Sequence, residues 1–196
     1  MARQPSALPT SASVVIIGGG VMGTSAAFHL AEAGVEVVLV ERAELGSGST
    51  SRGAGGIRAQ FSDALNVQIA QRSLDAFREF GARPGWEIDF KQVGYLFVLS
   101  RAADVAMFER HVALQNEHGV PSRMLTAAEA RTLCPLLDGD DILAAAFSPG
   151  HGFLQGPAVG EILRDLVLQR PTFVDIGPLS VERFGNAMLR PEFNIV

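Results

Sequence analysis

The feature that most constrains the fold is a glycine-rich turn that interrupts a run of β-branched residues near the amino terminus. Residues 14–23 read Val-Val-Ile-Ile-Gly-Gly-Gly-Val-Met-Gly, and a second β-branched run, residues 35–40, ends at Glu41. The order strand, glycine turn, helix, strand and acid is the fingerprint of a βαβ unit that binds a dinucleotide. The sequence therefore predicts a parallel pair of strands with a cofactor site at the turn between them.

Each part of this motif has a physical role. Gly18 permits the tight turn, Gly20 lets the backbone approach a pyrophosphate, and Gly23 lets the helix pack closely on the strand. The helix points its unpaired N–H groups and its positive dipole end at the phosphates. Glu41 follows Gly18 at close to the roughly 20-residue spacing of an acid that accepts hydrogen bonds from ribose hydroxyls. Because a carboxylate there repels a 2′-phosphate, NADP is disfavoured.

The sequence around the turn supports this interpretation. Residues 13–17 are typical of a buried parallel strand, and residues 24–33 have the small and apolar residues of a helix that stops at Gly34. A glycine-rich turn in an ordinary α/β protein is the alternative, and the complete flanking pattern disfavours it.

Composition limits the possible partners and the compartment. The 196 residues are 47% hydrophobic and carry a net charge of −5, so nucleic acid and anionic membrane surfaces are not expected as partners. The single cysteine, Cys134, leaves no pair for a disulfide within the chain, which favours a reducing, cytoplasmic location. No apolar run is long enough to span a bilayer, and residues 1–12 are expected to form a loose tail.

The rest of the chain predicts alternating helices and strands. A loop of small residues, 46–56, is interpreted as a cofactor-wrapping segment rather than a flexible linker, because it lies where an extended dinucleotide would leave the glycine turn. The helix after Ser62, its N-cap in this interpretation, has an apolar stripe of Leu65, Ile69, Leu74, Phe77 and Phe80. Further expected elements are strands at 87–90, 93–100 and 142–147, and helices at 102–118, 127–133 (capped by Thr126 with Glu129 in the capping-box position) and 157–168.

The sequence identifies neither a metal site nor a catalytic residue. The four histidines and Cys134 lack zinc-binding spacing, and the acidic run Asp138–Asp141 is interpreted as a solvated turn. There is no nucleophile elbow and no phosphate-loop lysine. The chemistry is therefore expected to come from a bound cofactor.

Three segments give the chain a family resemblance: the glycine turn with Glu41-Arg42, the loop at 48–58, and the segment Gly-His-Gly-Phe-Leu-Gln-Gly-Pro at 150–157. With these the chain resembles the FAD-dependent amine and amino-acid oxidoreductases of the D-amino-acid oxidase and sarcosine oxidase superfamily. The resemblance implies an α/β fold, in which a Rossmann-type FAD-binding βαβ unit is joined to a partial substrate-domain β-segment and peripheral helices. The expected segments are a tail (1–12), the FAD-binding unit and flavin loop (13–85), a partial substrate region (86–147) and a flavin-contacting turn, helix and tail (148–196).

The resemblance also assigns cofactor contacts to individual positions. Glu41, followed by Arg42, takes the adenosine ribose, while Ser49 and Thr50 donate to phosphate. The pyrophosphate is faced by Gly18, Gly20, Val21, Met22 and Gly23, and the flavin ring by Gly56, Ile57, Gly152, Phe153 and Leu154. Relatives with covalent flavin have a histidine where this chain has Arg52, so the FAD is expected to be non-covalent.

The chain departs from the family by being much shorter. Between Phe147 and His151 it passes directly to the carboxyl-terminal turn, whereas family members have a long stretch there that supplies substrate-binding side chains. We expect residues 142–147 to occupy a vacant sheet position beside residues 14–17.

The leading functional hypothesis is an FAD-dependent oxidoreductase that oxidises the C–N bond of an amino acid or secondary amine by hydride transfer to flavin. Arg58 is a candidate to bind a substrate carboxylate, although a surface or structural arginine is the alternative. A second hypothesis is a shortened, inactive FAD-binding subunit or interaction module, and a third is an NAD-dependent dehydrogenase. Each of the three hypotheses is compatible with a homo-oligomer or a hetero-oligomer.

Overall fold

The β-branched runs near the amino terminus form two parallel strands joined by a helix, as predicted. In the computed structural model, β1 (Val14–Ile17) pairs with β2 (Val37–Val40) in the register Val14 to Val37 through Ile17 to Val40. The intervening helix α1 (Val21–Glu32) begins directly after the glycine turn, three residues earlier than predicted, because the extended backbone of Gly20 serves as its N-cap. The structure describes residues 9–53, 57–85, 88, 90–149, 151–152 and 156–180.

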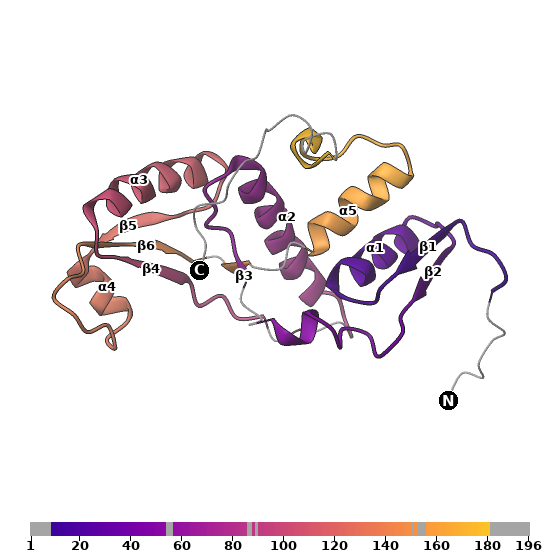
Figure 1. Cartoon of the computed structure of the whole chain (residues 1–196), viewed down its shortest axis with the longest axis horizontal. Helices are drawn as coiled ribbons and strands as arrows, with labels where there is room; N and C mark the ends of the chain where they lie inside the picture. The colour runs from indigo at the N-terminus through magenta and orange to yellow at the C-terminus, as the bar shows by residue number, and fades with distance from the viewer. Residues whose placement is uncertain are drawn as a thin grey trace. The chain divides into compact units, whose positions relative to one another are not determined.

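The chain divides into two compact units, which are described separately. The first comprises the chain up to residue 54 together with residues 159–172, and the second comprises residues 55–158 and 173 onward. Figure 1 shows α1 running alongside β1 and β2 in the first unit. Ala26 and Leu30 of α1 are buried. The helix α5 (Gly156–Val167) approaches α1 closely, since a Cβ atom at Gly160 would overlap the Ser25 hydroxyl.

The second unit is built on a three-stranded antiparallel sheet in the order β4–β6–β5. Its strands are β4 (Tyr95–Leu99), β5 (Arg123–Thr126) and β6 (Ala144–Ser148). Adjacent residues of a strand face opposite sides of the sheet, so Ala145 and Ala146 belong to two different hydrophobic cores, one on each face. Phe108 and Val112 of α3 (Ala102–Glu117) pack on the Ala146 side, while Ala130 of α4 (Ala127–Leu133) packs on the Ala145 side.

The helix α2 (Ala64–Gly81) supplies much of the remaining core of this unit. Leu65, Ile69 and Leu74 of the predicted stripe are buried, and Phe77 and Phe80 are half-buried. The N-cap is Asp63 rather than Ser62, because the Asp63 carboxylate accepts hydrogen bonds from the backbone N–H groups of Leu65 and Asn66. A short antiparallel pair joins β3 (Ile57–Arg58) to β7 (His151–Gly152), and two 3₁₀ turns complete the elements, η1 (Thr50–Arg52) and η2 (Gly177–Leu179).

Two strand predictions are corrected. Residues 144–148 form β6 at the centre of the antiparallel sheet instead of lying beside β1, because their small side chains fit between helices on both faces. Of residues 87–90, Ile88 and Phe90 are not in a strand, while Glu87 and Asp89 lie outside the described residues. The strand β5 was not predicted. The capping box of α4 is confirmed, with the Thr126 hydroxyl accepting from the Glu129 N–H.

Among the described residues, no helix combines the length and apolar character needed to cross a membrane.

Candidate cofactor site

The glycine turn has the geometry that the sequence motif predicts. Gly18 has a φ of +105°, a conformation that favours glycine, and its N–H donates to the Val40 carbonyl oxygen at 2.9 Å. A Cβ atom at Gly23 would overlap the carbonyl oxygen of Gly18, so the first turn of α1 packs on the turn backbone as closely as glycine allows. These two positions therefore require glycine for local reasons.

Glu41 lies beside this turn and fixes it through hydrogen bonds. Its Oε2 accepts from the Gly19 N–H at 2.7 Å, and its Oε1 accepts from the Ala43 N–H at 2.9 Å. The hydrogen bond from Gly19, followed by that from Ala43, holds the pKa of the Glu41 carboxyl below its ordinary value. The carboxylate is therefore charged at neutral pH and held at the end of β2.

Thr50 joins the loop after β2 to the amino terminus of α1. The Thr50 Oγ1 accepts from the Val21 N–H at 3.0 Å, and the Gly46 N–H donates to the Gly19 carbonyl oxygen at 2.8 Å. The loop thus folds over the glycine turn. Because a hydroxyl that accepts one hydrogen bond still has its own proton, Thr50 can donate to an anion at the same time.

The residues of this turn fit a pyrophosphate. Within the described chain, the N–H groups of Met22 and Gly23 in the first turn of α1 donate to no hydrogen bond. Unpaired N–H groups at a helix amino terminus, together with the helix dipole, favour a bound anion. Arg42 and Ser49, which belong to the same unit, are exposed. Their predicted roles, like those of the other assigned residues, stay predictions.

The predicted flavin-facing residues belong to the second unit or lie outside the described chain. Ile57 of β3 and Gly152 of β7 are backbone partners in an antiparallel pair, although 95 positions separate them, a pairing that no sequence signal indicated. Gly56, Phe153 and Leu154 lie outside the described residues.

Arg58 is buried among aromatic rings. Only 5% of its surface is exposed, and its guanidinium carbon lies 5.1 Å from the ring centre of Phe61, 5.8 Å from that of Tyr95 and 5.5 Å from that of Phe97. A cation on aromatic faces is stabilised by the ring quadrupoles. The sequence offered Arg58 only as a candidate to bind a substrate carboxylate. Its aromatic surroundings depend on β4, which lies far along the chain.

Among the described residues, no group of three histidine, cysteine, aspartate or glutamate side chains could hold a metal ion.

Comparisons with known proteins identify the family of this chain. Residues 13–170 match the family model described as "FAD dependent oxidoreductase". Human mitochondrial sarcosine dehydrogenase is 35% identical over 155 residues, covering 78% of this chain and 17% of the human protein. The mouse mitochondrial pyruvate dehydrogenase phosphatase regulatory subunit is 30% identical over 144 residues, covering 73% and 16%.

A solved structure supports the fold. The L-proline dehydrogenase of P. horikoshii superposes with a TM-score of 0.70 at 36% identity, covering 82% of this chain and 43% of that one. The chain therefore spans less than half the length of the proteins that it matches. The predicted family and the Rossmann-type α/β fold class are confirmed: the chain belongs to the FAD-dependent oxidoreductase family.

Proposed function

We propose that this chain binds FAD non-covalently at the glycine turn and takes part in the oxidation of an amino acid or secondary amine. The observation that carries the proposal is the set of groups at the start of α1: unpaired N–H groups of Met22 and Gly23, the Thr50 hydroxyl and the Glu41 carboxylate. Position 52, where relatives with covalently attached flavin have a histidine, is an arginine in this chain. The family match favours FAD over the NAD alternative.

Each of these groups has a proposed task. The N–H groups of Met22 and Gly23 neutralise pyrophosphate charge, and Thr50 donates its proton to a phosphate oxygen while still accepting from Val21. Glu41 accepts from ribose hydroxyls, which requires its carboxylate to share or exchange its present bonds from Gly19 and Ala43. Flavin contacts are assigned to the backbone around Ile57 and Gly152.

The substrate class is an amine that carries a carboxylate. Two of the similar proteins are named for sarcosine and L-proline, both of which are secondary-amine amino acids. The chemistry that FAD supplies when bound is acceptance of a hydride from the carbon next to the amine nitrogen. For this chain we propose that Arg58 binds the substrate carboxylate, with the rings of Phe61, Tyr95 and Phe97 holding the guanidinium in place. No general acid or base is assigned to this chain.

Flavin binding is tested with the purified full-length chain titrated with FAD. The expected result is quenching of FAD fluorescence and visible flavin absorbance that moves to the supernatant after acid precipitation. Flavin that stays with the pellet would contradict the interpretation of Arg52, and the absence of binding would remove the proposal. Bleaching of the bound flavin by sarcosine or L-proline without oxygen then tests the substrate class. The Arg58→Met variant is expected to bind FAD normally while losing the response to substrate.

The alternative is a flavin-binding subunit without chemistry of its own. One observation favours it: a relative is named as a regulatory subunit. The same titration separates the two functions, because this alternative predicts FAD binding without bleaching by any amine. A reducing compartment remains part of the proposal, supported by the single free cysteine, Cys134.

A further inference from the structure

A pocket in the second unit shares no residue with the proposed cofactor site. Its volume is about 450 Å³, within the range of small-molecule sites. It lies between α2, the segment before β4, the turn after α3 and the end of β6. The residues that line it are Gln71, Leu74, Arg78, Gln92, Gly119, Val120, Pro121 and Pro149.

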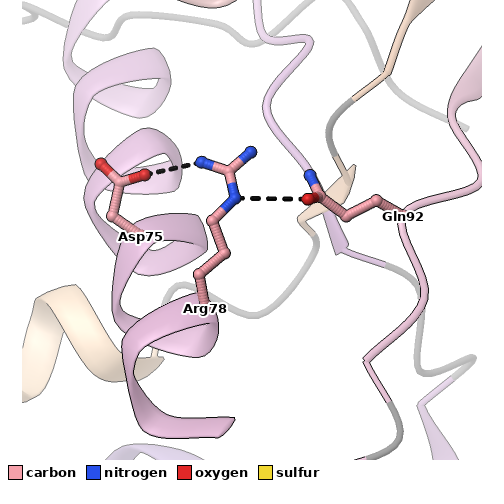
Figure 2. Close-up of polar contacts among 3 residues, drawn as sticks. All are labelled: Asp75, Arg78 and Gln92. Atoms are coloured by element: carbon pink, nitrogen blue, oxygen red, sulfur yellow. Dashed lines mark hydrogen bonds and ion pairs between the residues drawn. The ribbon is translucent and has the colours of Figure 1, made fainter. Parts of the chain in front are cut away.

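The polar side of this pocket is organised around the Arg78 guanidinium. Its Nη1 donates to Asp75 Oδ1 at 2.7 Å, and its Nε donates to Gln92 Oε1 at 3.4 Å. These two contacts fix the guanidinium from both ends (Figure 2). Within the described residues, the second terminal nitrogen of Arg78, Nη2, and the amide nitrogen of Gln92 take part in no hydrogen bond.

These two nitrogens form a pair of donors. Figure 2 shows both on the same side of the Arg78–Gln92 hydrogen bond. Two neighbouring N–H donors, one of them charged, match the two oxygens of a carboxylate. The Gln71 amide, which also has no hydrogen bond among the described residues, adds a further polar group to the lining.

The lining of the pocket also includes apolar residues. Leu74 and Val120 are buried, and Pro121 and Pro149 complete the wall. Among the lining residues that the structure describes, Arg78 is the one that carries a charge, and Asp75, which is not among them, offsets part of that charge. The chemistry therefore suits a single negative group attached to an apolar body.

We propose that this pocket binds a small carboxylate that carries an apolar body, with its oxygens on Arg78 Nη2 and the Gln92 amide nitrogen. The ligand is either a simple organic acid or an α-amino acid, which share the carboxylate. The Asp75 carboxylate orients the guanidinium and also weakens binding, because it is a second negative charge beside the same cation.

The test is a titration of the full-length ¹⁵N-labelled chain, without added FAD, by three matched probes: 3-phenylpropanoate, 3-phenylpropanamide and L-phenylalanine. We expect the acid to shift the side-chain N–H signals of Arg78, Gln92 and Gln71, and the uncharged amide to leave them unchanged. Equal shifts with the amide, or no shift with either carboxylate, would overturn the proposal. Phenylalanine binding more tightly than the acid assigns an amino acid as ligand, and weaker binding assigns an organic acid.

Variants test the donors. Arg78→Gln and Gln92→Leu are each expected to weaken binding of the acid, by about tenfold for Arg78→Gln, which removes the charged donor. Asp75→Asn is expected to tighten binding of the acid about threefold to fivefold, because it removes the solvent-screened repulsion between the Asp75 carboxylate and the ligand carboxylate. Arg110→Gln removes an exposed arginine of α3 outside the pocket and is the matched control. An equal loss in the control, or weaker binding in Asp75→Asn, contradicts the proposal. Because no flavin is present, the result is independent of the proposed cofactor function.

Discussion

The three-stranded antiparallel sheet and the parallel β1–β2 sheet differ in how completely helices of their own unit cover them. In the antiparallel β4–β6–β5 sheet, Leu99 and Ala146 pack against α3, and Leu125 and Ala145 pack against α4. In the parallel β1–β2 sheet, α1 contacts one face, while Val15 is 58% exposed and Ile17 is 88% exposed on the other. One sheet is therefore the middle layer of its unit, and the other is an outer layer.

The difference in coverage indicates that the parallel sheet needs a further layer to bury its apolar face, whereas the antiparallel sheet does not. Parallel sheets in globular proteins are normally covered on both faces, and two strands alone bury little surface. The outer face of β1 and β2 carries the apolar side chains of a buried layer, although Val15 and Ile17 are exposed, and sarcosine dehydrogenase and L-proline dehydrogenase have longer chains. The second unit has a core that its own helices complete. We therefore expect the second unit to carry most of the stability of the chain.

The largest effect expected from this comparison comes from one matched pair of truncations. Leu125→Ala in the second unit removes a buried side chain and should lower the free energy of unfolding by about 2–5 kcal/mol. Ile17→Ala removes a similar number of atoms from an exposed site and should change it by less than about 0.5 kcal/mol. Urea unfolding followed by circular dichroism measures both. Similar losses in the two variants would mean that the face containing Ile17 is covered in solution.

The next effect tests the glycine turn of the first unit. Gly23→Ala places a methyl group on the carbonyl oxygen of Gly18, and should destabilise the first unit by about 1–3 kcal/mol and abolish FAD binding. Gly48→Ala is the control, because the same methyl group there meets no atom within 4 Å. Hydrogen exchange of α1 and FAD titration measure the two effects. Retained FAD binding in Gly23→Ala would argue against the site at this turn.

The sequence predicted the parts of the fold that depend on local pattern. The β-branched runs, the glycine turn and the capping box of Thr126 and Glu129 each lie within a few residues, so propensity and turn chemistry determine them. It also predicted which residues gather near the turn, since Glu41 and the loop around Thr50 follow a known motif.

The parts that the sequence did not predict depend on contacts between distant residues. Residues 142–147 were expected beside β1, because an apolar run does not specify its partner strand. The observed pairing of β6 with β4 and β5 depends on how small alanines fit between two helices. The aromatic surroundings of Arg58 and the donor pair of Arg78 and Gln92 likewise combine residues from separate elements. Periodicity carries no information on such pairings.

A smaller effect compares the hydroxyl acceptors at two helix starts. Thr126→Val removes the acceptor for the Glu129 N–H of α4, and Thr50→Val removes the acceptor for the Val21 N–H of α1. Each should cost about 1 kcal/mol locally. Amide hydrogen exchange should show faster exchange at Glu129 in the first variant and at Val21 in the second. Thr50→Ser, which retains the hydroxyl, should restore slow exchange at Val21, and failure to do so would show that the methyl group matters instead.

The smallest effect is a pH dependence shared by the two units. Backbone N–H donors lower the pKa of Glu41, with Gly19 as the main cause, and of Glu129, with Thr126 as the main cause. A carboxyl whose pKa is lower in the folded state contributes stability above its unfolded-state pKa, and this contribution is lost as the pH falls through the folded-state value. Glu41→Gln and Glu129→Gln should therefore be less stable than the parent chain at neutral pH, and the difference should fade in acid. The Gly19 N–H that donates to Glu41 is 22 positions away in the sequence, whereas the Thr126 N–H that donates to Glu129 is three positions away. The hydrogen bond of Glu41 therefore depends on the fold of the first unit, and chemical denaturation of that unit should abolish the pKa shift of Glu41. A ¹³C titration of the two carboxyl groups measures both pKa values, and an ordinary pKa for Glu41 in the folded chain would show that its bond to the glycine turn does not form in solution.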